Sequence, residues 1–444
     1  MQASITPPVP VSLGTAFWYW LKLGCVSFGG PAGQIAMMHA ELVEKRRWIS
    51  EQRFLHALNY CMLLPGPEAT QLAIYIGWLM HRTRGGILAG LLFLLPSLLV
   101  LIALSSIYMA YGNVPAIAGI LYGIKPAVVA IVLAAAWRLG RRTLRSPSLI
   151  GIALASFIAI TALHLPFPLI VLGACLLGVA GGYLLPGQFH TVGASHGAAG
   201  SHLPALIDDT TPTPPHARFT WPRLLATSLA GMLLMCLAWL ALALLGGREQ
   251  PLAQMAVFFS KAALLTFGGA YAVLPYLVQG AVDHYHWLSS AQMMDGLALG
   301  ETTPGPLIMI VAFIGFVSGW SHAVLGEQLW LAGVTGALVT AWFTFLPSFI
   351  FILAGAPVVE ATRGNLRLNA PLTAISAAVV GVIASLAVFF GHHVFLPDTP
   401  TPHADWLAIA IGAAAAVALM KFQIGTIKLL LAGAICGLVL SYLT

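Results

Sequence analysis

Residues 64–78 read LPGPEATQLAIYIGW, and the Pro-Gly-Pro turn in this stretch separates two short apolar segments, Phe54–Leu64 and Glu68–Met80. Each segment has about 11–13 residues and as a helix would rise about 18 Å, roughly half the thickness of a bilayer. A helix breaks at such a turn, because proline removes a backbone donor and glycine relaxes the dihedral constraint. The stretch therefore predicts a re-entrant helical hairpin, which enters a membrane and returns on the same side.

The composition of the whole chain explains why a membrane is expected. Of its 444 residues, 59% are hydrophobic and 8% are charged, whereas soluble domains average about 45–50% and about 25%. These values exclude an ordinary soluble domain, a disordered chain and a disulfide-rich secreted module. The apolar stretches also run well past the roughly 10 residues of an outer-membrane barrel strand. The predicted fold class is all-α, a polytopic helical membrane protein.

Nine further segments have the length and apolar character of spanning helices. They are Gly85–Tyr111, Ala116–Trp137, Ser148–Leu165, Phe167–Leu185, Pro222–Leu245, Gln328–Val359, Leu372–Phe390, Asp405–Met420 and Ile427–Leu443. No basic region precedes the first apolar segment, so no cleaved signal peptide is expected. The five cysteines lie singly in apolar segments and are expected to pack there, so neither a metal site nor a cofactor is predicted.

The chain contains two copies of one unit. A shift of 239 positions, as from Lys22 to Lys261, also brings FGG at 28–30 onto FGG at 267–269, and the first Pro-Gly-Pro onto the second at 304–306. A shift of 251 positions aligns Leu-Pro-Ser at 95–97 with Leu-Pro-Ser at 346–348. We expect a first repeat with two extra helices over residues 1–186, a flexible cytoplasmic linker over 187–220, and a second repeat with flanking helices over 221–444.

The charges predict that the two copies are inverted. Three loops of the first copy are basic, and their counterparts in the second copy contain no lysine or arginine. The basic loops are Lys45–Arg47, Arg82–Arg84 and Arg138–Arg145, and the counterparts are His284–His286, Ser321–Gln328 and His392–Asp398. Because positive loops stay in the cytoplasm, the copies should lie in opposite senses, as in many transporters. The N-terminus is then cytoplasmic and the C-terminus periplasmic or extracellular. The net charge of +6 does not indicate nucleic-acid binding, because the basic residues lie in short clusters between apolar segments, where they set the orientation in the membrane.

The two Pro-Gly-Pro turns are the first candidates for ligand binding. Irregular backbone at membrane depth persists only inside protein or beside a water-filled cavity, and a half-helix that starts there directs free N–H groups at an anion. The candidate residues are Pro65, Gly66, Pro67, Thr70, Gln71, Thr302, Thr303, Pro304, Gly305 and Pro306. The alternative is that each turn is only a structural kink. Two turns at equivalent positions favour this alternative less than a single turn would.

The FGG sequences supply the second pair of candidates. Each follows a hydroxyl residue and lets a backbone approach a ligand or a neighbouring helix closely. The candidate residues are Ser27, Gly29, Gly30, Thr266, Gly268 and Gly269. Close helix packing explains these glycines equally well. Each FGG interrupts its segment, which forms either a second hairpin or a tilted spanning helix.

Charged residues inside the apolar segments are the third group. Lys22 and Lys261 occupy equivalent positions, where two ammonium groups would offset a divalent anion, although both could snorkel to the interface. Glu68 and Glu301 lie beside the Pro-Gly-Pro turns and suit a coupling proton, although Glu68 is equally placed to cap a helix. No enzyme motif and no P-loop is present. We therefore expect no enzyme, and transport driven by an ion gradient or by the membrane potential.

Together these motifs resemble the chromate ion transporter family in its long, two-domain form. The matching pieces are FGGPAGQIAMMH at 28–39, LPGPEATQLAIYIGW at 64–78, LLPSLL at 94–99, FGGAYAVLPYL at 267–277, TTPGP at 302–306, FIGF at 313–316 and FLPSF at 345–349. The resemblance implies efflux of chromate, a tetrahedral dianion, across the bacterial inner membrane, which confers chromate resistance. The expected partners are this oxyanion and membrane lipid. A second copy of the chain, forming a homodimer, is a further candidate partner. The alternatives are transport of sulfate or another oxyanion, an anion channel, or an intramembrane enzyme.

Overall fold

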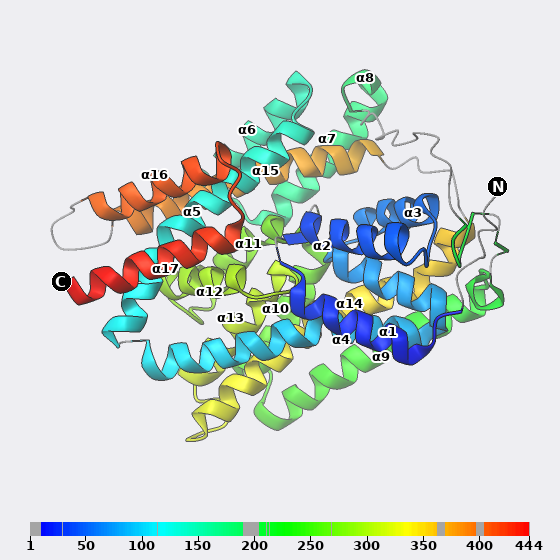
Figure 1. The fold of residues 1–444 in the computed structure, drawn as a ribbon, viewed down its shortest axis with the longest axis horizontal. Helices are drawn as coiled ribbons and strands as arrows, with labels where there is room; N and C mark the ends of the chain where they lie inside the picture. Colours follow the sequence, from blue (N-terminus) through cyan, green and yellow to red (C-terminus); the bar gives the residue numbers. More distant parts are fainter. Residues whose placement is uncertain are drawn as a thin grey trace, which may run out of the picture.

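The computed structural model describes residues 10–28, 30–112, 114–189, 204–209, 211–212, 214–267, 269–361, 369–396 and 404–443. Within these residues the regular structure is helical apart from one isolated β-bridge, between Ile49 and Ile207. Seven of the helices are long and apolar enough to cross a membrane (Figure 1). The predicted fold class, an all-α polytopic membrane protein, is confirmed.

The seven long helices correspond to seven of the nine predicted spans. They are α4 (Glu68–Tyr111), α5 (Pro115–Thr143), α7 (Phe167–Leu184), α9 (Trp221–Gly246), α14 (Leu329–Ala361), α15 (Asn369–Phe395) and α17 (Thr426–Leu443). The other two are shorter than predicted, since α6 (Pro147–Thr161) and α16 (Trp406–Met420) have 15 residues each. Helix α6 ends early because His164 has a φ of 50° and the proline that follows Leu165 disfavours a helical backbone there.

Shorter helices fill the rest of each half in the same order. The first half holds α1 (Leu13–Val26), α2 (Gly30–His39), the π-helix η1 (Ala40–Lys45) and α3 (Glu51–Leu63), and α8 (Pro186–Phe189) covers the start of the predicted linker. The second half holds α10 (Pro251–Leu265), α11 (Ala270–Val278), the π-helix η3 (Gln279–His284), α12 (Ser290–Thr302), the 3-10 helix η4 (Leu307–Met309) and α13 (Ile310–Ser321).

Backbone details recur at the shift of 239 positions that relates the two halves in sequence. Arg47 and His286 both have positive φ, 53° and 52°, just after the two π-helices. Ser50 and Ser289 start α3 and α12 in the same way, each hydroxyl accepting a hydrogen bond from a backbone N–H three residues on. Such caps fix where a helix begins. These local signals therefore set the start of α3, the helix before the first Pro-Gly-Pro turn, and of α12, the helix before the second.

Both FGG segments fold back on themselves. The Trp48 ring, after η1, lies 5.1 Å from the Tyr19 ring of α1. At the equivalent positions, the Trp287 ring lies 5.4 Å from the Phe258 ring of α10. These contacts bring the residues just after each segment back to its first helix, and the choice between a re-entrant hairpin and a tilted spanning helix stays a prediction.

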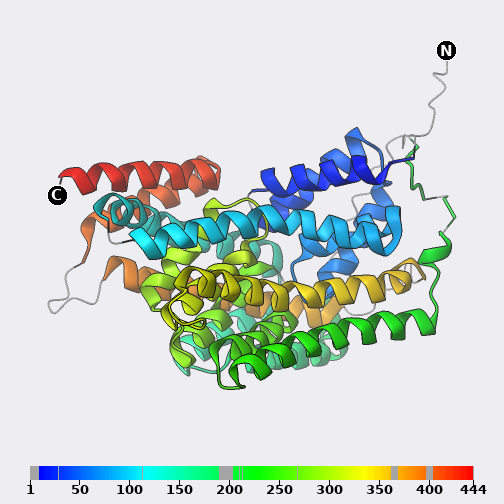
Figure 2. The same ribbon diagram turned by 90° about the horizontal axis from the view of Figure 1, so that it is seen from below.

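The long helices α4 and α14 cross the centre of the protein side by side and in opposite directions (Figure 2). Helix α4 is kinked, because His81 and Arg82 have non-helical backbone angles. This kink separates the hairpin arm of α4 from its long apolar part, which contains the predicted span Gly85–Tyr111. Helix α17 packs on α5 so closely that a methyl group added at Gly123 would lie 2.1 Å from the Gly433 carbonyl oxygen.

Part of the predicted linker is packed against the first half. The backbone N–H groups of Leu206 and Ile207 donate to the carbonyls of Arg47 and Trp48, at 2.9 and 3.1 Å. A 3-10 turn, η2 (Pro215–Ala217), follows before α9. Residues 190–203, the remainder of the linker before these contacts, lie outside the described residues.

Candidate functional site

Each Pro-Gly-Pro turn meets the FGG break of the other half. The Gly66 N–H donates to the Thr266 carbonyl, and the Gly305 N–H donates to the Ser27 carbonyl, both at 2.7 Å. The four residues form two pairs related by the 239-position shift. The tip of each hairpin is therefore held by the broken segment of the opposite half, and the two halves interlock at their irregular backbone.

A serine of the opposite half packs against each turn glycine. A methyl group at Gly66 would lie 2.4 Å from the Ser348 Oγ of α14, and one at Gly305 would lie 2.6 Å from the Ser97 Cβ of α4. Both glycines also have left-handed backbone, with φ of 124° and 102°. Glycine is required at both turns for conformation and for space.

Two glutamines bind the turns. The Gln34 Nε2 donates to the Gly305 carbonyl at 2.6 Å, and the Gln71 Nε2 donates to the Pro65 carbonyl at 2.7 Å. Gln71 also lies 3.4 Å from the Ser348 hydroxyl. These bonds satisfy the amide nitrogens and fix which way each amide oxygen points.

Several buried polar atoms around the turns have no hydrogen-bond partner among the described residues. These atoms are Ser27 Oγ, Gln34 Oε1, Thr70 Oγ1, Gln71 Oε1 and Ser97 Oγ, and all five side chains are fully buried. An unpaired buried polar group costs about 1–3 kcal/mol, so this set suits a polar ligand. We call these five residues, with Gly66, Gly305 and Ser348, the crossed-turn site.

The helix starts beside the two turns differ. Helix α4 begins at Glu68 directly after the first turn, with no side chain capping its free N–H groups. After the second turn the chain forms the 3-10 helix η4, and the α-helix starts only at Ile310. The half-helix expected directly after the second turn therefore starts later than predicted, and only the first turn is followed at once by the free N–H groups of an α-helix.

The predicted threonines of the second half use their hydroxyl protons locally. Thr266, Thr302 and Thr303 donate to carbonyls three or four residues earlier, at 2.7–2.8 Å. Their oxygens remain acceptors, so they suit a ligand that carries a proton better than a bare oxyanion. Gly30 and Gly269 have φ of 72° and 101°, as glycine allows.

The remaining FGG candidates, Gly29 and Gly268, lie outside the described residues. Pro65, Pro67, Pro304 and Pro306 form the frames of the two turns.

The two predicted lysines are not among the residues that meet at the crossed-turn site. Lys22 and Lys261 are exposed on α1 and α10, whereas their neighbours Leu23 and Ala262 are buried. Both ammonium groups therefore lie on exposed helix faces, and their role in binding the anion stays a prediction. Their placement agrees with the snorkelling alternative.

Both predicted acids are half-buried next to the turns. Glu301 accepts a hydrogen bond from the Tyr271 hydroxyl, just after the second FGG. Glu68 lies in the first turn of α4, where its charge would complement the helix dipole. Their role in proton coupling stays a prediction.

Sequence reasoning missed Ser97 and Ser348 as site residues. The signal was present, because both belong to Leu-Pro-Ser motifs that align at the shift of 251 positions. Within the described part of the chain, no group of three or more histidine, cysteine, aspartate or glutamate side chains is arranged to hold a metal ion.

The family model described as "Chromate transporter" matches the chain twice, over residues 14–179 and 253–438. The chain belongs to the chromate transporter family. The two matches of this family start 239 positions apart, the same shift that relates the FGG and Pro-Gly-Pro motifs, and each match contains one FGG and one Pro-Gly-Pro motif. The resemblance read from the motifs is confirmed.

Relatives of similar length bear related names. The chain is 29% identical to the chromate transport protein of Cupriavidus metallidurans, over 95% of this chain and 91% of that protein. It is 32% identical to the chromate transport protein of Pseudomonas aeruginosa, over 86% and 82% of the two chains. It is 30% identical to the probable chromate transport protein of Synechococcus elongatus, over 86% and 85%. No solved structure matches significantly.

Proposed function

We propose that the protein is a secondary transporter that exports chromate from the bacterial cytoplasm and thereby confers chromate resistance. Family membership supports a role in chromate transport, and the relatives are named as transport proteins rather than enzymes. One observation carries the proposal for the site. Each Pro-Gly-Pro turn is hydrogen-bonded to the FGG break of the opposite half, and buried hydroxyls beside these turns have no partner among the described residues.

The arrangement suits a tetrahedral dianion. Serine and threonine hydroxyls and the uncapped N-terminus of α4 donate hydrogen bonds without carrying a full charge. Such a site binds an oxyanion through several moderate contacts and can release it again. Chromate and sulfate present nearly the same oxygens to these donors, so sulfate is the expected competitor.

Alternating access between two inverted repeats is the proposed mechanism. Helices α4 and α14 run antiparallel, as an inverted repeat requires. Because each hairpin tip is bound to the opposite half at the crossed-turn site, rocking of one half against the other would open the site first to one side and then to the other.

The proposed orientation places the linker in the cytoplasm of a bacterial cell, inside the inner membrane. The Arg47 carbonyl accepts a hydrogen bond from the Leu206 N–H of the linker, and Arg82 lines a cavity together with Leu206 and His216 of the linker. Two basic loops therefore lie beside the linker, and positive loops stay cytoplasmic.

The test is uptake of labelled chromate into inside-out membrane vesicles that contain the protein. We expect saturable uptake that sulfate inhibits. Ser27→Ala with Ser97→Ala should reduce kcat/KM by about 100-fold or more, because each of the two lost hydrogen bonds to a charged ligand contributes about 1.5–3 kcal/mol. The matched control is Ser105→Ala, which removes a buried hydroxyl without a described partner two turns further along α4. Unchanged uptake in the double variant contradicts the proposed site, and flux that rises linearly without saturation indicates a channel.

A further inference from the structure

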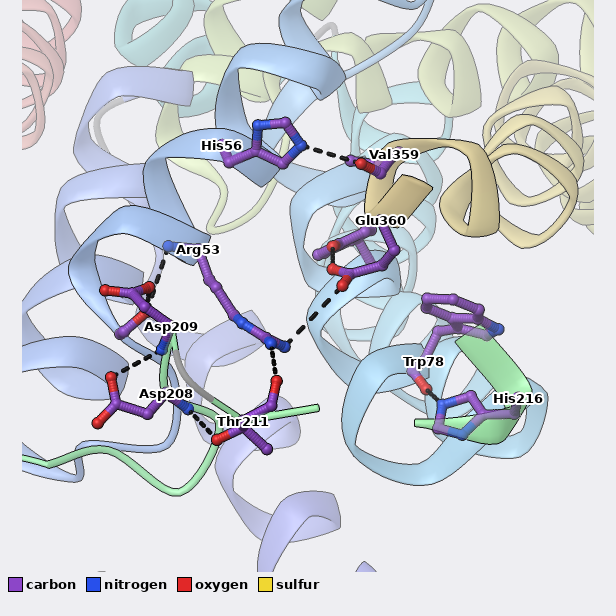
Figure 3. A network of polar contacts seen from close by, with 11 residues as sticks. Arg53, His56, Trp78, Asp208, Asp209, Thr211, His216, Val359 and Glu360 are labelled. Atoms are coloured by element: carbon purple, nitrogen blue, oxygen red, sulfur yellow. Dashed lines mark hydrogen bonds and ion pairs between the residues drawn. The ribbon is translucent and has the colours of Figure 1, made fainter. Parts of the chain in front are cut away.

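A buried ion pair joins the hairpin of the first half to the second half. The Arg53 Nη1 of α3 lies 3.9 Å from the Glu360 Oε2 at the end of α14, and both side chains are almost fully buried. The Tyr75 hydroxyl of α4 donates to the other Glu360 oxygen. Figure 3 shows Arg53 between Glu360 and the linker, where its Nη2 donates to the Thr211 carbonyl at 2.5 Å. We call Arg53, Tyr75 and Glu360 the linker-end cluster.

A second ion pair, between a lysine and an aspartate, joins the hairpin of the second half to the first half. The Lys125 Nζ of α5 lies 3.0 Å from the Asp295 Oδ1 of α12. The Tyr108 hydroxyl of α4 donates to the Asp295 Oδ2 at 3.0 Å. We call Tyr108, Lys125 and Asp295 the far-end cluster. In both clusters a cation and a tyrosine hydroxyl converge on the two oxygens of one carboxylate.

The two clusters lie on opposite sides of the crossed-turn site. On α14, Glu360 comes 12 residues after Ser348, and on α4, Tyr108 comes 11 residues after Ser97. At 1.5 Å per residue these separations are about 18 and 16 Å. Because α4 and α14 are antiparallel, the two distances run in opposite directions from the centre.

Each cluster blocks movement of one hairpin. Helix α3 is tied to α14, and α12 is tied to α5 and α4, so neither hairpin can leave the opposite half without separating an ion pair. A buried ion pair is a weak source of stability, because desolvation offsets its attraction. Removing one partner is costly, however, so the cation would need another anion when the pair separates.

A tetrahedral oxyanion is such an anion. It presents two oxygens to the Arg53 guanidinium in nearly the same geometry as a carboxylate, and it attracts the Lys125 ammonium as a point charge. It accepts a hydrogen bond from a tyrosine hydroxyl just as well. We propose that the two clusters are oxyanion-binding sites at the ends of the transport pathway. The cation and tyrosine of each cluster bind the substrate when it displaces the cluster's own carboxylate, and this exchange frees the hairpin. The inference rests on the proposed function and extends it from one central site to three.

The test is equilibrium binding of labelled chromate to the purified, detergent-solubilised full chain. Glu360→Gln and Asp295→Asn remove the competing charge and keep the shape of the side chain. Each is expected to tighten chromate binding about tenfold and to slow transport, since the corresponding end no longer closes on its own anion. The control is Glu327→Gln, which neutralises an exposed acid and should leave both quantities unchanged.

A second pair of variants keeps the test decisive if an acid variant fails to fold. Tyr108→Phe and Tyr75→Phe each remove one donor and should weaken chromate binding several-fold without lowering the melting temperature by more than a few degrees. Wild-type affinity in the folded acid and tyrosine variants would overturn the inference. If the wild-type chain itself neither binds nor transports chromate, the proposed function fails instead.

Discussion

Replacement of Gly305 by alanine is the sharpest test of the interlocked turns. The residue has a φ of 102°, and an added methyl group would lie 2.6 Å from the Ser97 Cβ and 2.9 Å from its Oγ. A left-handed backbone costs a residue with a Cβ about 1–2 kcal/mol, and overpacking in a well-packed interior costs about 1–3 kcal/mol. The expected loss in free energy of unfolding is therefore about 2–5 kcal/mol.

The two contributions can be separated with a matched glycine. Gly247 also has left-handed backbone, with a φ of 88°, but an added methyl group there meets no atom within 4 Å. Gly247→Ala should therefore show only the conformational cost of about 1–2 kcal/mol. Ser97→Gly, introduced into Gly305→Ala, removes both contacted atoms and should recover most of the remaining loss.

The assay is reversible unfolding of the purified protein in mixed detergent micelles, alongside chromate uptake by vesicles. Gly305→Ala should lose uptake even where it remains folded, because the methyl group separates the turn from α4. If Gly305→Ala unfolds within about 0.5 kcal/mol of the wild-type protein and transports normally, the turn does not pack as described, and the reasoning about the crossed-turn site is refuted.

Two further predictions concern the linker and the exposed lysines. Burial, together with the nearby charge of Arg82, lowers the pKa of His216 below its usual 6.5, and its Nε2 lies 3.2 Å from the Trp78 carbonyl. Since the released linker binds a proton more readily, docking should be complete above pH 6.5 and weaken as the pH falls below it. Limited proteolysis of the linker at pH 7.5 and 5.5 measures this change in docking. The His216→Gln variant corrects for the pH dependence of the protease itself. Equal protection of the wild-type linker at both pH values contradicts the prediction. Lys22→Ala with Lys261→Ala should leave chromate uptake within about twofold of wild type, because both side chains are exposed; a larger loss at equal abundance would restore them to the pathway.

Local chemistry decided much of what could be predicted from the sequence. Apolar composition and segment length indicated the membrane helices, because a segment that spans lipid must satisfy its own backbone hydrogen bonds. Proline and glycine act on their own residues, so the break positions at the Pro-Gly-Pro and FGG motifs were also predictable. The 239-position shift was visible in the sequence, and the positive φ angles and serine caps recur at it.

Only the tertiary structure decided which residues meet. Gly66 binds Thr266 and Gly305 binds Ser27, contacts that no local pattern encodes, because their partners lie some 200 or more positions away. Lys22 was predicted to face the binding site, but its side chain is exposed. The sequence could not show this, because an almost wholly apolar helix has no polar face to indicate which side is buried. The amino-acid sequence by itself thus determined where helices begin, break and end. The rotation of each helix and the crossing of the two halves were determined by packing between distant segments, and that packing created the crossed-turn site and both ion-pair clusters.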